Sequence, residues 1–486
     1  MIYKLRPYQE ECVKSISDYI NSDRHDPVLI VGPVGCGKSL LIAEAARLMG
    51  DKTLILQPSK ELLQQNHNKI TSYGIPATIY SASCGKKELS NMIYATLGSI
   101  KKVVGQLKEM GIRNVLIDEA HAGYSPEDGS EFMTFMNELK PKKVIGFTAT
   151  PCRLKTMSIG QVSYSQLNFI TRMRPVYFKN LIHVIQVEEM IRQGFWTPLK
   201  YETWDFNGDA LKLNSNGSEY TAESISEAVR KNGLNNLILR RLMVLKDVCR
   251  SILVFMDSVE SCNTAAEWMN AKICAGMAEV VHGGTPKKQR EAIVEGFKSG
   301  KTKVVFNYSA LGTGFDHPGL GCVIVGRPTF SFSSFYQWLG RAVRIKDGKD
   351  SALVVDCCNN SSRFGDIRKL SIENYKGYGW GMFIGDKLIT NIPMGDKVTK
   401  TDLDIKAAKK DRRRGLAQGV TAAPVPGRPD HPLGSTVMTF GKYCGWMFHS
   451  IPVSYFKFIN ETFDWDNDRN KDIKEYIDFL IKNNRL

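Results

Sequence analysis

Acidic residues are scarce relative to basic ones in this chain of 486 residues, which has 50 Asp and Glu against 65 Lys and Arg. The formal net charge at pH 7 is therefore +15. An excess of this size favours a polyanionic partner, nucleic acid first, although a basic soluble protein without such a partner can have the same balance. The hydrophobic fraction of 43% excludes a mainly disordered or collagen-like chain.

The 11 cysteines contain no CxxC pair, so the usual ligand spacing of a cysteine-rich zinc site or an iron–sulfur cluster is missing. Their odd number and irregular spacing favour reduced thiols in the cytoplasm over a disulfide framework. The N-terminus lacks the apolar segment of a secretory signal, and no apolar run reaches the roughly 18 residues that a membrane span requires. We therefore expect a cytoplasmic protein without a membrane partner.

The length predicts about three domains, at roughly 100–200 residues each. Short apolar runs alternate with helical patterns over residues 1–151 and 233–375, which indicates an α/β fold with two parallel sheets and flanking helices. Residues 152–232 are aromatic-rich and poorly periodic, and we interpret them as a connector or small insertion. Residues 376–434 combine a basic run with a Pro- and Gly-rich stretch typical of a linker. A small C-terminal α+β module is expected at 435–486.

A glycine-rich turn with the sequence GPVGCGKS follows the apolar run at residues 27–31 and opens a helical pattern. It matches GxxxxGK[ST] in the context that this motif requires, because backbone N–H groups at a helix N-terminus favour phosphate. We expect Lys38 to reach the β- and γ-phosphates of ATP and the Ser39 hydroxyl to hold Mg²⁺. The glycines of the predicted phosphate loop are Gly32, Gly35 and Gly37.

Two adjacent acids, Asp118 and Glu119, directly follow an apolar strand pattern that ends at Ile117. A carboxylate at a strand end can hold the Mg²⁺ of a nucleotide bound at the phosphate loop, and the second can accept a proton from the attacking water. Adjacent acids are common on protein surfaces, so the prediction depends on the strand before them and on the loop upstream. We assign the metal to Asp118 and the proton to Glu119.

The segment from Asp118 to His121 reads DEAH and, behind a phosphate loop, resembles superfamily 2 helicases of the DEAH/DEAD-box type. Further segments match that superfamily in order over residues 1–375. The resemblance implies two tandem RecA-like domains with ATP and Mg²⁺ in the cleft between them. It also implies that Arg6 and Gln9 recognise adenine.

Three later segments extend the resemblance. Thr148 and Thr150 resemble the hydroxyls that couple the nucleotide site, with His121, to the second domain. The segment at residues 311–318 resembles the motif that contacts both nucleotide and nucleic acid, and from it we carry over Thr313, Gly314 and Asp316. The segment at residues 337–344 matches QxxGRxxR, which implies catalytic roles for Gln337, Arg341 and Arg344. The spacing predicts that both arginines lie on one helical face and act as arginine fingers.

Loops at the far edge of the cleft are expected to contact the nucleic-acid backbone without reading its sequence. For each single residue an ordinary turn is an equally good interpretation. With Thr313, the residues that the resemblance assigns to this track are Gln57, Pro58, Ser59, Thr96, Ser258, Gly283 and Thr285.

The residues in these motifs most resemble those of compact phage and bacterial DNA helicases. These include UvsW-like branch-migration helicases and the motor subunits of restriction systems. No long segment precedes the motor, which favours a stand-alone phage-type protein. The resemblance implies a monomeric ATP-dependent DNA helicase or translocase that remodels forked or branched DNA in replication, recombination or repair, in a bacterial or phage-infected host cytoplasm. An RNA helicase and a catalytically degenerate nucleic-acid-binding protein are the alternatives.

The C-terminal segment resembles a small module of unassigned role. Two interpretations of its aromatic residues stay open: they stack on bases, or they form the core of a domain of about 50 residues. The residues concerned are Lys442, Tyr443, Trp446 and Tyr455. The basic run at residues 409–414 is either a tether for the DNA backbone or a solvated linker.

Overall fold

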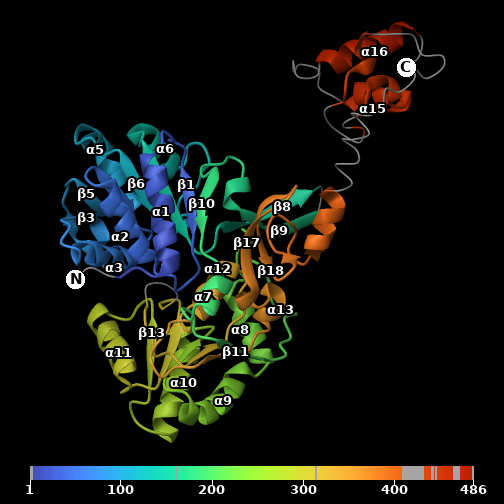
Figure 1. Cartoon of the computed structure of the whole chain (residues 1–486). Coiled ribbons are helices and arrows are strands. Elements are labelled where there is room, and N and C mark those ends of the chain that lie inside the picture. The colour runs from blue at the N-terminus through green and yellow to red at the C-terminus, as the bar shows by residue number, and fades with distance from the viewer. Residues whose placement is uncertain are drawn as a thin grey trace. The chain divides into compact units, whose positions relative to one another are not determined.

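The computed structural model of the protein describes most of the chain. The described residues are 4–159, 162–311, 315–407, 432–438, 443, 446–462 and 471–483. They form two compact units, of which the larger comprises residues 1–375 and 379–398 and the smaller comprises residues 376–378 and 399–486. The larger unit contains two lobes, coloured blue to teal and green to yellow in Figure 1. No helix among the described residues is long and apolar enough to cross a membrane.

The first lobe is built on an eight-stranded sheet with the order β10-β1-β7-β6-β2-β5-β3-β4. Its interior strands are short apolar runs buried on both faces, as expected where helices cover a parallel sheet. Among the described strand pairs of this sheet, only the short β4 is antiparallel to its neighbour, β3. The elements are α1 (Pro7–Asn21), β1 (Val28–Val31), α2 (Lys38–Met49), β2 (Thr53–Leu56), α3 (Lys60–Thr71), β3 (Thr78–Ser81), β4 (Lys86–Lys87), β5 (Met92–Ala95), α4 (Leu97–Ile100), α5 (Val104–Glu109), β6 (Asn114–Ile117), α6 (Glu131–Leu139), β7 (Lys143–Thr148) and β10 (Asn180–Val184).

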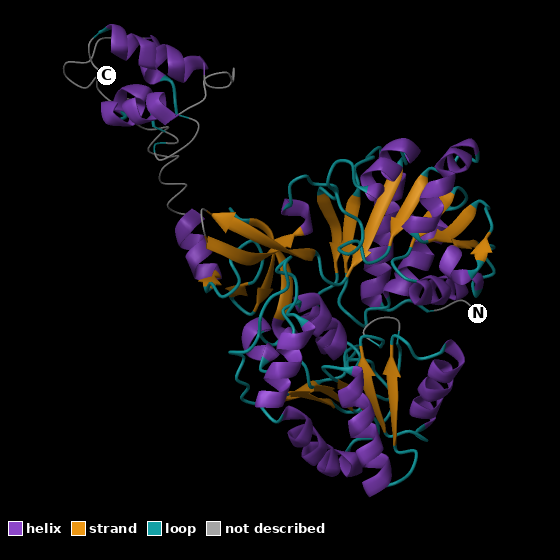
Figure 2. Ribbon diagram, turned by 180° about the vertical axis from the view of Figure 1, so that it is seen from behind, coloured by secondary structure: helices purple, strands orange, loops and turns teal. Residues whose placement is uncertain are grey.

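The second lobe is built on a six-stranded parallel sheet with the order β11-β16-β15-β12-β14-β13. Figure 2 shows the strands of both lobes flanked by helices, which is the predicted fold class of two tandem α/β domains. The elements are β11 (Leu199–Thr203), α8 (Ala222–Lys231), α9 (Leu234–Val248), β12 (Ile252–Phe255), α10 (Val259–Lys272), β13 (Ala278–His282), α11 (Lys287–Ser299), β14 (Val304–Tyr308), β15 (Cys322–Val325), α12 (Phe332–Leu339), β16 (Ala352–Asp356) and α13 (Asn360–Phe364).

The interpretation of residues 152–232 as a separate connector or insertion is wrong. Strand β10 pairs in parallel with β1 and completes the first sheet, and β11 pairs in parallel with β16 and belongs to the second. Both are edge strands with little or no full burial along their length, so they lack the continuous apolar run that marks an interior strand. Between the two lobes the chain forms the antiparallel hairpin of β8 (Cys152–Ile159) and β9 (Val162–Phe169) and the helix α7 (Val187–Arg192).

The linker predicted for residues 376–434 is also partly wrong. The strand β18 (Gly379–Ile384) pairs antiparallel with β17 (Leu370–Tyr375) along its whole length and then with β19 (Lys387–Leu388). Within β18, Gly381, Met382 and Phe383 are buried, whereas Gly379, Trp380 and Ile384 are half-buried. A short strand β20 (Val398–Thr399) follows. The basic run at residues 409–414 lies outside the described residues.

The smaller unit includes the helices α15 (Val453–Thr462) and α16 (Lys471–Lys482). Its described residues also include an isolated antiparallel bridge between Val437 and Met447. The core is apolar and partly aromatic, and it consists of Met438, Phe448, Ile451, Phe456, Ile459, Ile473, Tyr476, Ile477 and Leu480. Tyr443 and Tyr455 pack against this core, whereas Trp446 is 47% exposed. Lys442 lies outside the described residues.

A buried lysine joins the end of α1 to the start of β7. The Lys143 ammonium donates three hydrogen bonds, to the carbonyls of Tyr19 (2.9 Å), Ser22 (2.6 Å) and Arg24 (2.6 Å). These carbonyls lie in and just beyond the last turn of α1. A cation is favourable there because the C-terminal end of the helix dipole carries partial negative charge. The lysine therefore satisfies acceptors that the helix itself leaves unpaired.

We predict that Lys143→Met lowers the free energy of unfolding by about 1–3 kcal/mol, because it leaves the three carbonyls without their donor. Urea denaturation followed by circular dichroism measures the change. The neighbouring Lys142→Met, at an exposed position, is the matched control and should change stability by less than about 0.5 kcal/mol. Equal effects of the two variants would contradict a structural role for the Lys143 hydrogen bonds.

Candidate nucleotide site between the two lobes

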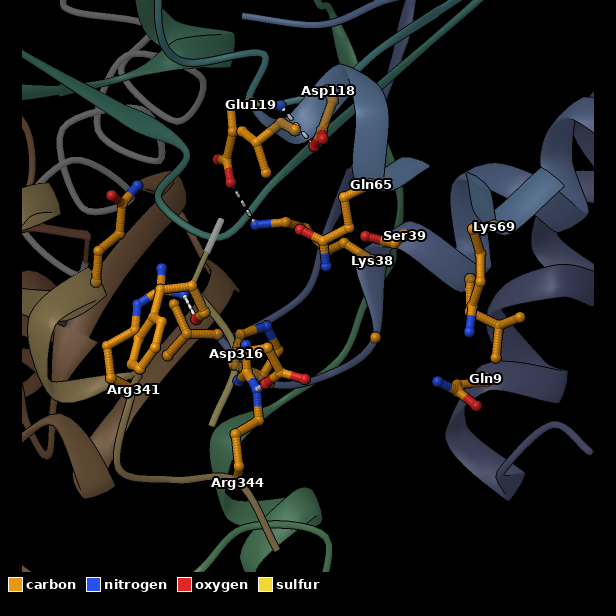
Figure 3. Close-up of a pocket in the computed structure, with 18 of the residues that line it drawn as sticks. Gln9, Lys38, Ser39, Gln65, Lys69, Asp118, Glu119, Asp316, Arg341 and Arg344 are labelled. Carbon is orange, nitrogen blue, oxygen red and sulfur yellow. Dashed lines mark hydrogen bonds and ion pairs between the residues drawn. The ribbon is translucent and has the colours of Figure 1, made fainter. Parts of the chain in front are cut away.

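A cavity of about 680 Å³ lies between the two lobes of the larger unit. The predicted ATP-site residues that line it come from both lobes: Arg6, Gln9, Gly35, Gly37, Lys38, Ser39, Asp118, Glu119, Asp316, Gln337, Arg341 and Arg344. Figure 3 shows the two arginines on the opposite side of the cavity from Lys38 and Glu119. Of the other predicted cofactor-binding residues, Gly32 lies outside the lining and Gly314 lies outside the described residues.

The phosphate loop runs from the end of β1 into α2, and two of its glycines have left-handed backbone conformations. Gly35 has φ +89°, and a Cβ there would lie 2.7 Å from a terminal guanidinium nitrogen of Arg344. Gly37 has φ +83°, and a Cβ there would lie 2.6 Å from the amide nitrogen of Gln9. Both positions therefore require glycine for conformation and for space. The contact at Gly35 also shows that Arg344 of the second lobe packs directly against the loop.

The two acids of the DEAH segment differ in their surroundings. Asp118 is buried, and its carboxylate accepts hydrogen bonds from the Asn66 amide and from the backbone N–H of Glu119, both at 2.9 Å. Burial, and next the charge of Glu119, raise the pKa of Asp118 to about 7. Burial alone would also raise the pKa of Glu119, but Lys38, His121 and Arg341 together outweigh it and hold that pKa below its usual value. Lys38 Nζ donates to Glu119 Oε1 at 2.8 Å.

The donor set at the loop suits Mg²⁺, a hard cation that prefers oxygen ligands. Ser39 and Asp118 both line the cavity and present a hydroxyl and a carboxylate. No group of three or more His, Cys, Asp or Glu side chains that could hold a metal occurs among the described residues. A magnesium ion held here would thus take its remaining ligands from phosphate and water, as this ion usually does beside nucleotides.

His121 does not line the cavity but connects the first lobe to the second. Its Nδ1 lies 2.8 Å from Thr148 Oγ1, and its Nε2 lies 3.2 Å from the hydroxyl of Ser333 on α12. The Ser333 hydroxyl lies 3.1 Å from Thr150 Oγ1. Burial lowers the pKa of His121 to about 4, so the ring is neutral at pH 7 and these contacts are hydrogen bonds between uncharged groups. Thus the two threonines and the histidine do meet the second lobe, as the resemblance implied, through a serine that the sequence did not identify.

The prediction that Arg341 and Arg344 lie on one helical face is wrong. Helix α12 ends at Leu339, and both arginines lie in the turn after it. The helix stops at Gly340, where a Cβ would come within 2.6 Å of Val34 in the phosphate loop, so this glycine allows the two lobes to approach closely. The arginines still converge on the cavity, since a turn can direct them there as well as a helix can.

Each arginine donates a hydrogen bond to a residue of its own lobe, Phe315 or Asp316. Arg344 Nε donates to Asp316 Oδ1 at 3.0 Å, and Arg341 donates to the carbonyl of Phe315. Burial, and next the charge of Arg344, lower the pKa of Arg341 to about 10, so it stays protonated at pH 7. Asp316 thus lines the cavity, as predicted, and also accepts a hydrogen bond from Arg344.

The predicted adenine-recognising residues line the cavity, but the amide of Gln9 is hydrogen-bonded within the protein. Its oxygen accepts from the backbone N–H of Arg6 at 3.0 Å, and its nitrogen donates to the carbonyl of Cys36 at 2.9 Å. The Arg6 guanidinium carbon lies 4.6 Å from the ring centroid of Phe195. Gln9 thus fixes the phosphate loop as well as lining the site.

Most of the predicted nucleic-acid contacts serve local turns in this structure. The hydroxyls of Ser59 and Ser258 cap α3 and α10, and Thr285 Oγ1 accepts from the backbone N–H of His282 at 3.0 Å. Thr96 bonds to neighbouring serines, and Gln57 is buried with an amide that has no hydrogen-bond partner. The remaining candidates are exposed Pro58, the loop residue Gly283, and Thr313, which lies outside the described residues.

Two residues that sequence reasoning missed connect the arginine turn to the phosphate loop. The indole N–H of Trp196 donates to the Val34 carbonyl at 2.7 Å. The next residue, Thr197, donates from its hydroxyl to the carbonyl of Arg344 at 2.6 Å and from its backbone N–H to Val343 at 2.9 Å. Trp196 and Thr197 belong to no motif that the sequence analysis recognised. The tryptophan in a poorly periodic segment was the one feature that could have indicated them.

Two parallel-sheet lobes with a phosphate loop on one and an arginine turn on the other define a class of two-lobed nucleotide-binding proteins. Residues 2–153 match the family described as Type III restriction enzyme, res subunit, and residues 235–346 match the Helicase conserved C-terminal domain. Together with the helicase relatives below, these matches support a superfamily 2 helicase.

Among the relatives is a 51.5 kDa protein of a Lactococcus phage, 25% identical over 332 residues, which cover 68% of this chain and 65% of the relative. Another is the putative ATP-dependent helicase IRC3 of Saccharomyces cerevisiae, 24% identical over 57% of this chain and 38% of its own length. The chain thus spans less than two thirds of both relatives.

The fold is shared with solved structures of low sequence identity. The ATP-dependent Type ISP restriction-modification enzyme LlaBIII superposes with a TM-score of 0.55 at 15% identity, over 86% of this chain and 30% of that one. A fragment of a putative HsdR subunit from Vibrio vulnificus gives a TM-score of 0.54 at 17% identity, over 75% of this chain and 66% of that one. These likenesses confirm the two tandem RecA-like domains.

The close approach of Gly340 to Val34 yields a test of the contact between the lobes. We predict that Gly340→Ala lowers stability by about 1–3 kcal/mol, because the new methyl group overlaps the Val34 side chain. Adding Val34→Ala should restore part of the loss by making room, which thermal unfolding of the single and double variants measures. Gly105→Ala, where a Cβ meets nothing within 4 Å, is the control. Additive effects of the two substitutions would contradict a direct contact.

Proposed function

We propose that this protein is an ATP-driven DNA motor that remodels or unwinds forked or branched DNA, of the UvsW-like branch-migration type. The observation that carries the proposal is the shared cavity: Lys38 and Glu119 of one lobe and Arg341 and Arg344 of the other line the same space. Such a site is complete only while the lobes are closed, so ATP binding and hydrolysis can drive their relative motion.

In the proposed reaction the Lys38 ammonium leaves Glu119 and binds the β- and γ-phosphates, which frees the Glu119 carboxylate to accept a proton from the attacking water. The water oxygen bonds to the γ-phosphorus as the bond to the bridging oxygen of ADP breaks. Arg341 and Arg344 stabilise the negative charge of the transferred phosphoryl group. Mg²⁺, held by Ser39 and Asp118, would supply further charge neutralisation.

DNA is the proposed track for two reasons. The net charge of +15 favours a polyanion. Relatives that span the motor region include a protein named as a DNA 3'-5' translocase, XPB2 of Sulfurisphaera tokodaii, 24% identical over 72% of this chain and 81% of that one. The phage relative supports action in a phage-infected host cytoplasm. We propose that the chain works as a monomer.

We predict that Glu119→Gln reduces DNA-stimulated ATP hydrolysis at least about 100-fold while ATP binding is retained, because a general base typically contributes 10²–10⁴-fold. Lys38→Ala should lose both hydrolysis and tight ATP binding. Phosphate release and the fluorescence of a labelled nucleotide measure the two properties. Exposed Glu109→Gln is the control and should behave like the native chain. A fully active Glu119→Gln variant would remove the proposed base, and a native chain without any phosphate release would favour a degenerate binding protein.

The proposed track is tested by comparing forked DNA, four-way junctions, displacement loops and RNA for ATPase stimulation and strand separation. Forked or branched DNA should stimulate hydrolysis most, and its binding should weaken steeply with salt because phosphate contacts release counterions. Stronger stimulation by RNA would assign the protein to the RNA helicases of the same superfamily. Stimulation by DNA without strand separation would identify a duplex translocase.

A further inference from the structure

The arginine turn, residues 341–344, is held from outside by the side chain of a lysine. The Lys349 ammonium donates hydrogen bonds to the carbonyls of Ala342 at 2.7 Å, Arg344 at 2.8 Å and Pro318 at 3.1 Å. Two of these acceptors lie in the arginine turn, and the third lies in the separate segment that pairs with Arg344. Because an ammonium has three donors, this one side chain satisfies all three carbonyls and joins the two segments.

The local sequence KDGK explains how Lys349 reaches back to the arginine turn. The backbone N–H of Lys349 donates to the carbonyl of Lys346 at 3.0 Å, and Gly348 between them has φ +74°. This is a tight turn of four residues with glycine at its third position, where the left-handed conformation suits glycine best. The first three residues of the turn are exposed, whereas Lys349 is half-buried. The turn therefore reverses the chain and returns one of its two lysines to Ala342 and Arg344.

A neutral residue supplies further donors to the same turn. Thr197 donates from its hydroxyl to the carbonyl of Arg344 at 2.6 Å and from its backbone N–H to the carbonyl of Val343 at 2.9 Å. With the bonds from Lys349, three successive carbonyls of the turn accept from other segments. They lie just beyond the C-terminal end of α12, where a cation is favourable because that end of the helix dipole carries partial negative charge. Of the two donor residues, the lysine is the one that brings this charge.

We propose that Lys349 is a positioning residue of the ATPase, whose ammonium fixes the backbone of the arginine turn so that Arg344 is directed at the nucleotide. Arg344 lines the nucleotide cavity and Lys349 lies outside the lining, so the lysine acts through the arginine. Asp316 holds the guanidinium end of Arg344 (Figure 3), and Lys349 holds its backbone end. Fixing both ends sets the direction of the side chain. The inference rests on the proposed function, because Arg344 is catalytic only in a chain that hydrolyses ATP.

The surroundings of Lys349 weaken its hold on the proton and thereby connect the arginine turn to pH. Burial, and next the charge of Arg344, lower the pKa of Lys349 to about 8. Asp316 pairs with Arg344, and no ion pair to Lys349 within 4.0 Å occurs in the part of the chain that the structure describes.

The neighbouring His317 does not titrate in the same range, because burial and four cations lower its pKa to about 4. These cations are Lys346, Lys298, Lys349 and Arg250. Below about pH 8 the Lys349 ammonium thus has three N–H donors for its three carbonyls, and above about pH 8 the neutral amine has two.

Lys349→Met removes the ammonium and keeps most of the length of the side chain. It should lower kcat about 10- to 100-fold, the range for a catalytic group misplaced by about 1 Å, while the KM for ATP changes less than about threefold. Lys346→Met is the matched control, since it removes one positive charge from an exposed position of the same turn, and its kcat should stay within about twofold of native. Equal kcat values for the two variants would overturn the positioning role.

The pH profile of kcat tests the same role without removing the charge, so it applies even if Lys349→Met does not fold. The kcat of the native chain should fall as the pH rises through about 8, because the third donor of Lys349 is lost there. Lys349→Arg should retain most of the native rate at pH 7 and keep it to about pH 10, because a guanidinium stays protonated. An alkaline fall at the same pH in both proteins would contradict the proposal, since a purely structural lysine predicts no difference between them.

A double-mutant cycle determines whether Lys349 acts through Arg344. In an Arg344→Ala background, followed by single-turnover hydrolysis, Lys349→Met should lower the rate less than about threefold, because the arginine that it positions is already gone. A further loss as large as in the native background would show that Lys349 acts elsewhere and would overturn the inference.

Failure of the proposed function gives a different result. A native chain that releases no phosphate with any nucleic acid at any pH overturns both the proposed function and this inference. An active native chain whose Lys349→Met variant behaves like Lys346→Met overturns this inference alone.

Discussion

The contact between the arginine turn of the second lobe and the phosphate loop of the first is the constraint on which the rest of the site depends. Arg344 packs against Gly35, and Gly340 packs against Val34, at distances that exclude even one additional methyl group. Because the loop and the turn belong to different sheets, every catalytic distance in the cavity depends on this contact. The glycines therefore set the closed geometry, and the charged side chains act within it.

The charged groups of the cavity already have partners within the protein. Lys38 pairs with Glu119, and Arg344 pairs with Asp316. A buried charge without a partner is strongly destabilising, so these pairs keep the closed lobes stable without a nucleotide. In the proposed reaction, part of the binding energy of the triphosphate is used to separate Lys38 from Glu119. The proposed separation moves the cation to the phosphates and leaves the carboxylate free to act as a base.

The parts of the fold and site that depend on local sequence were predictable, and those that depend on distant contacts were not. The phosphate loop and Asp118-Glu119 stand next to buried apolar strands, so their place at strand ends follows from the pattern alone. The edge strands β10 and β11 were missed because half-exposed strands have no distinctive run. The arginines were placed on a helix because the sequence shows their spacing but not the approach of Val34 that requires Gly340. Trp196 and Ser333 act through hydrogen bonds to residues more than 150 positions away, for which no local pattern exists.

The two lobes are coupled through neutral hydrogen bonds as well as through charges, and the difference matters for motion. His121, Ser333 and Thr150 form a chain of uncharged contacts across the lobes, since burial holds the pKa of His121 near 4. Neutral hydrogen bonds each contribute only about 1 kcal/mol net, whereas a charge that loses its partner in a buried site costs several. The neutral chain can therefore break and re-form in each cycle at low cost, while the arginines need an anion or Asp316 at every stage. Both the arginine turn and the histidine chain therefore contact the other lobe, but the histidine chain does so without charge.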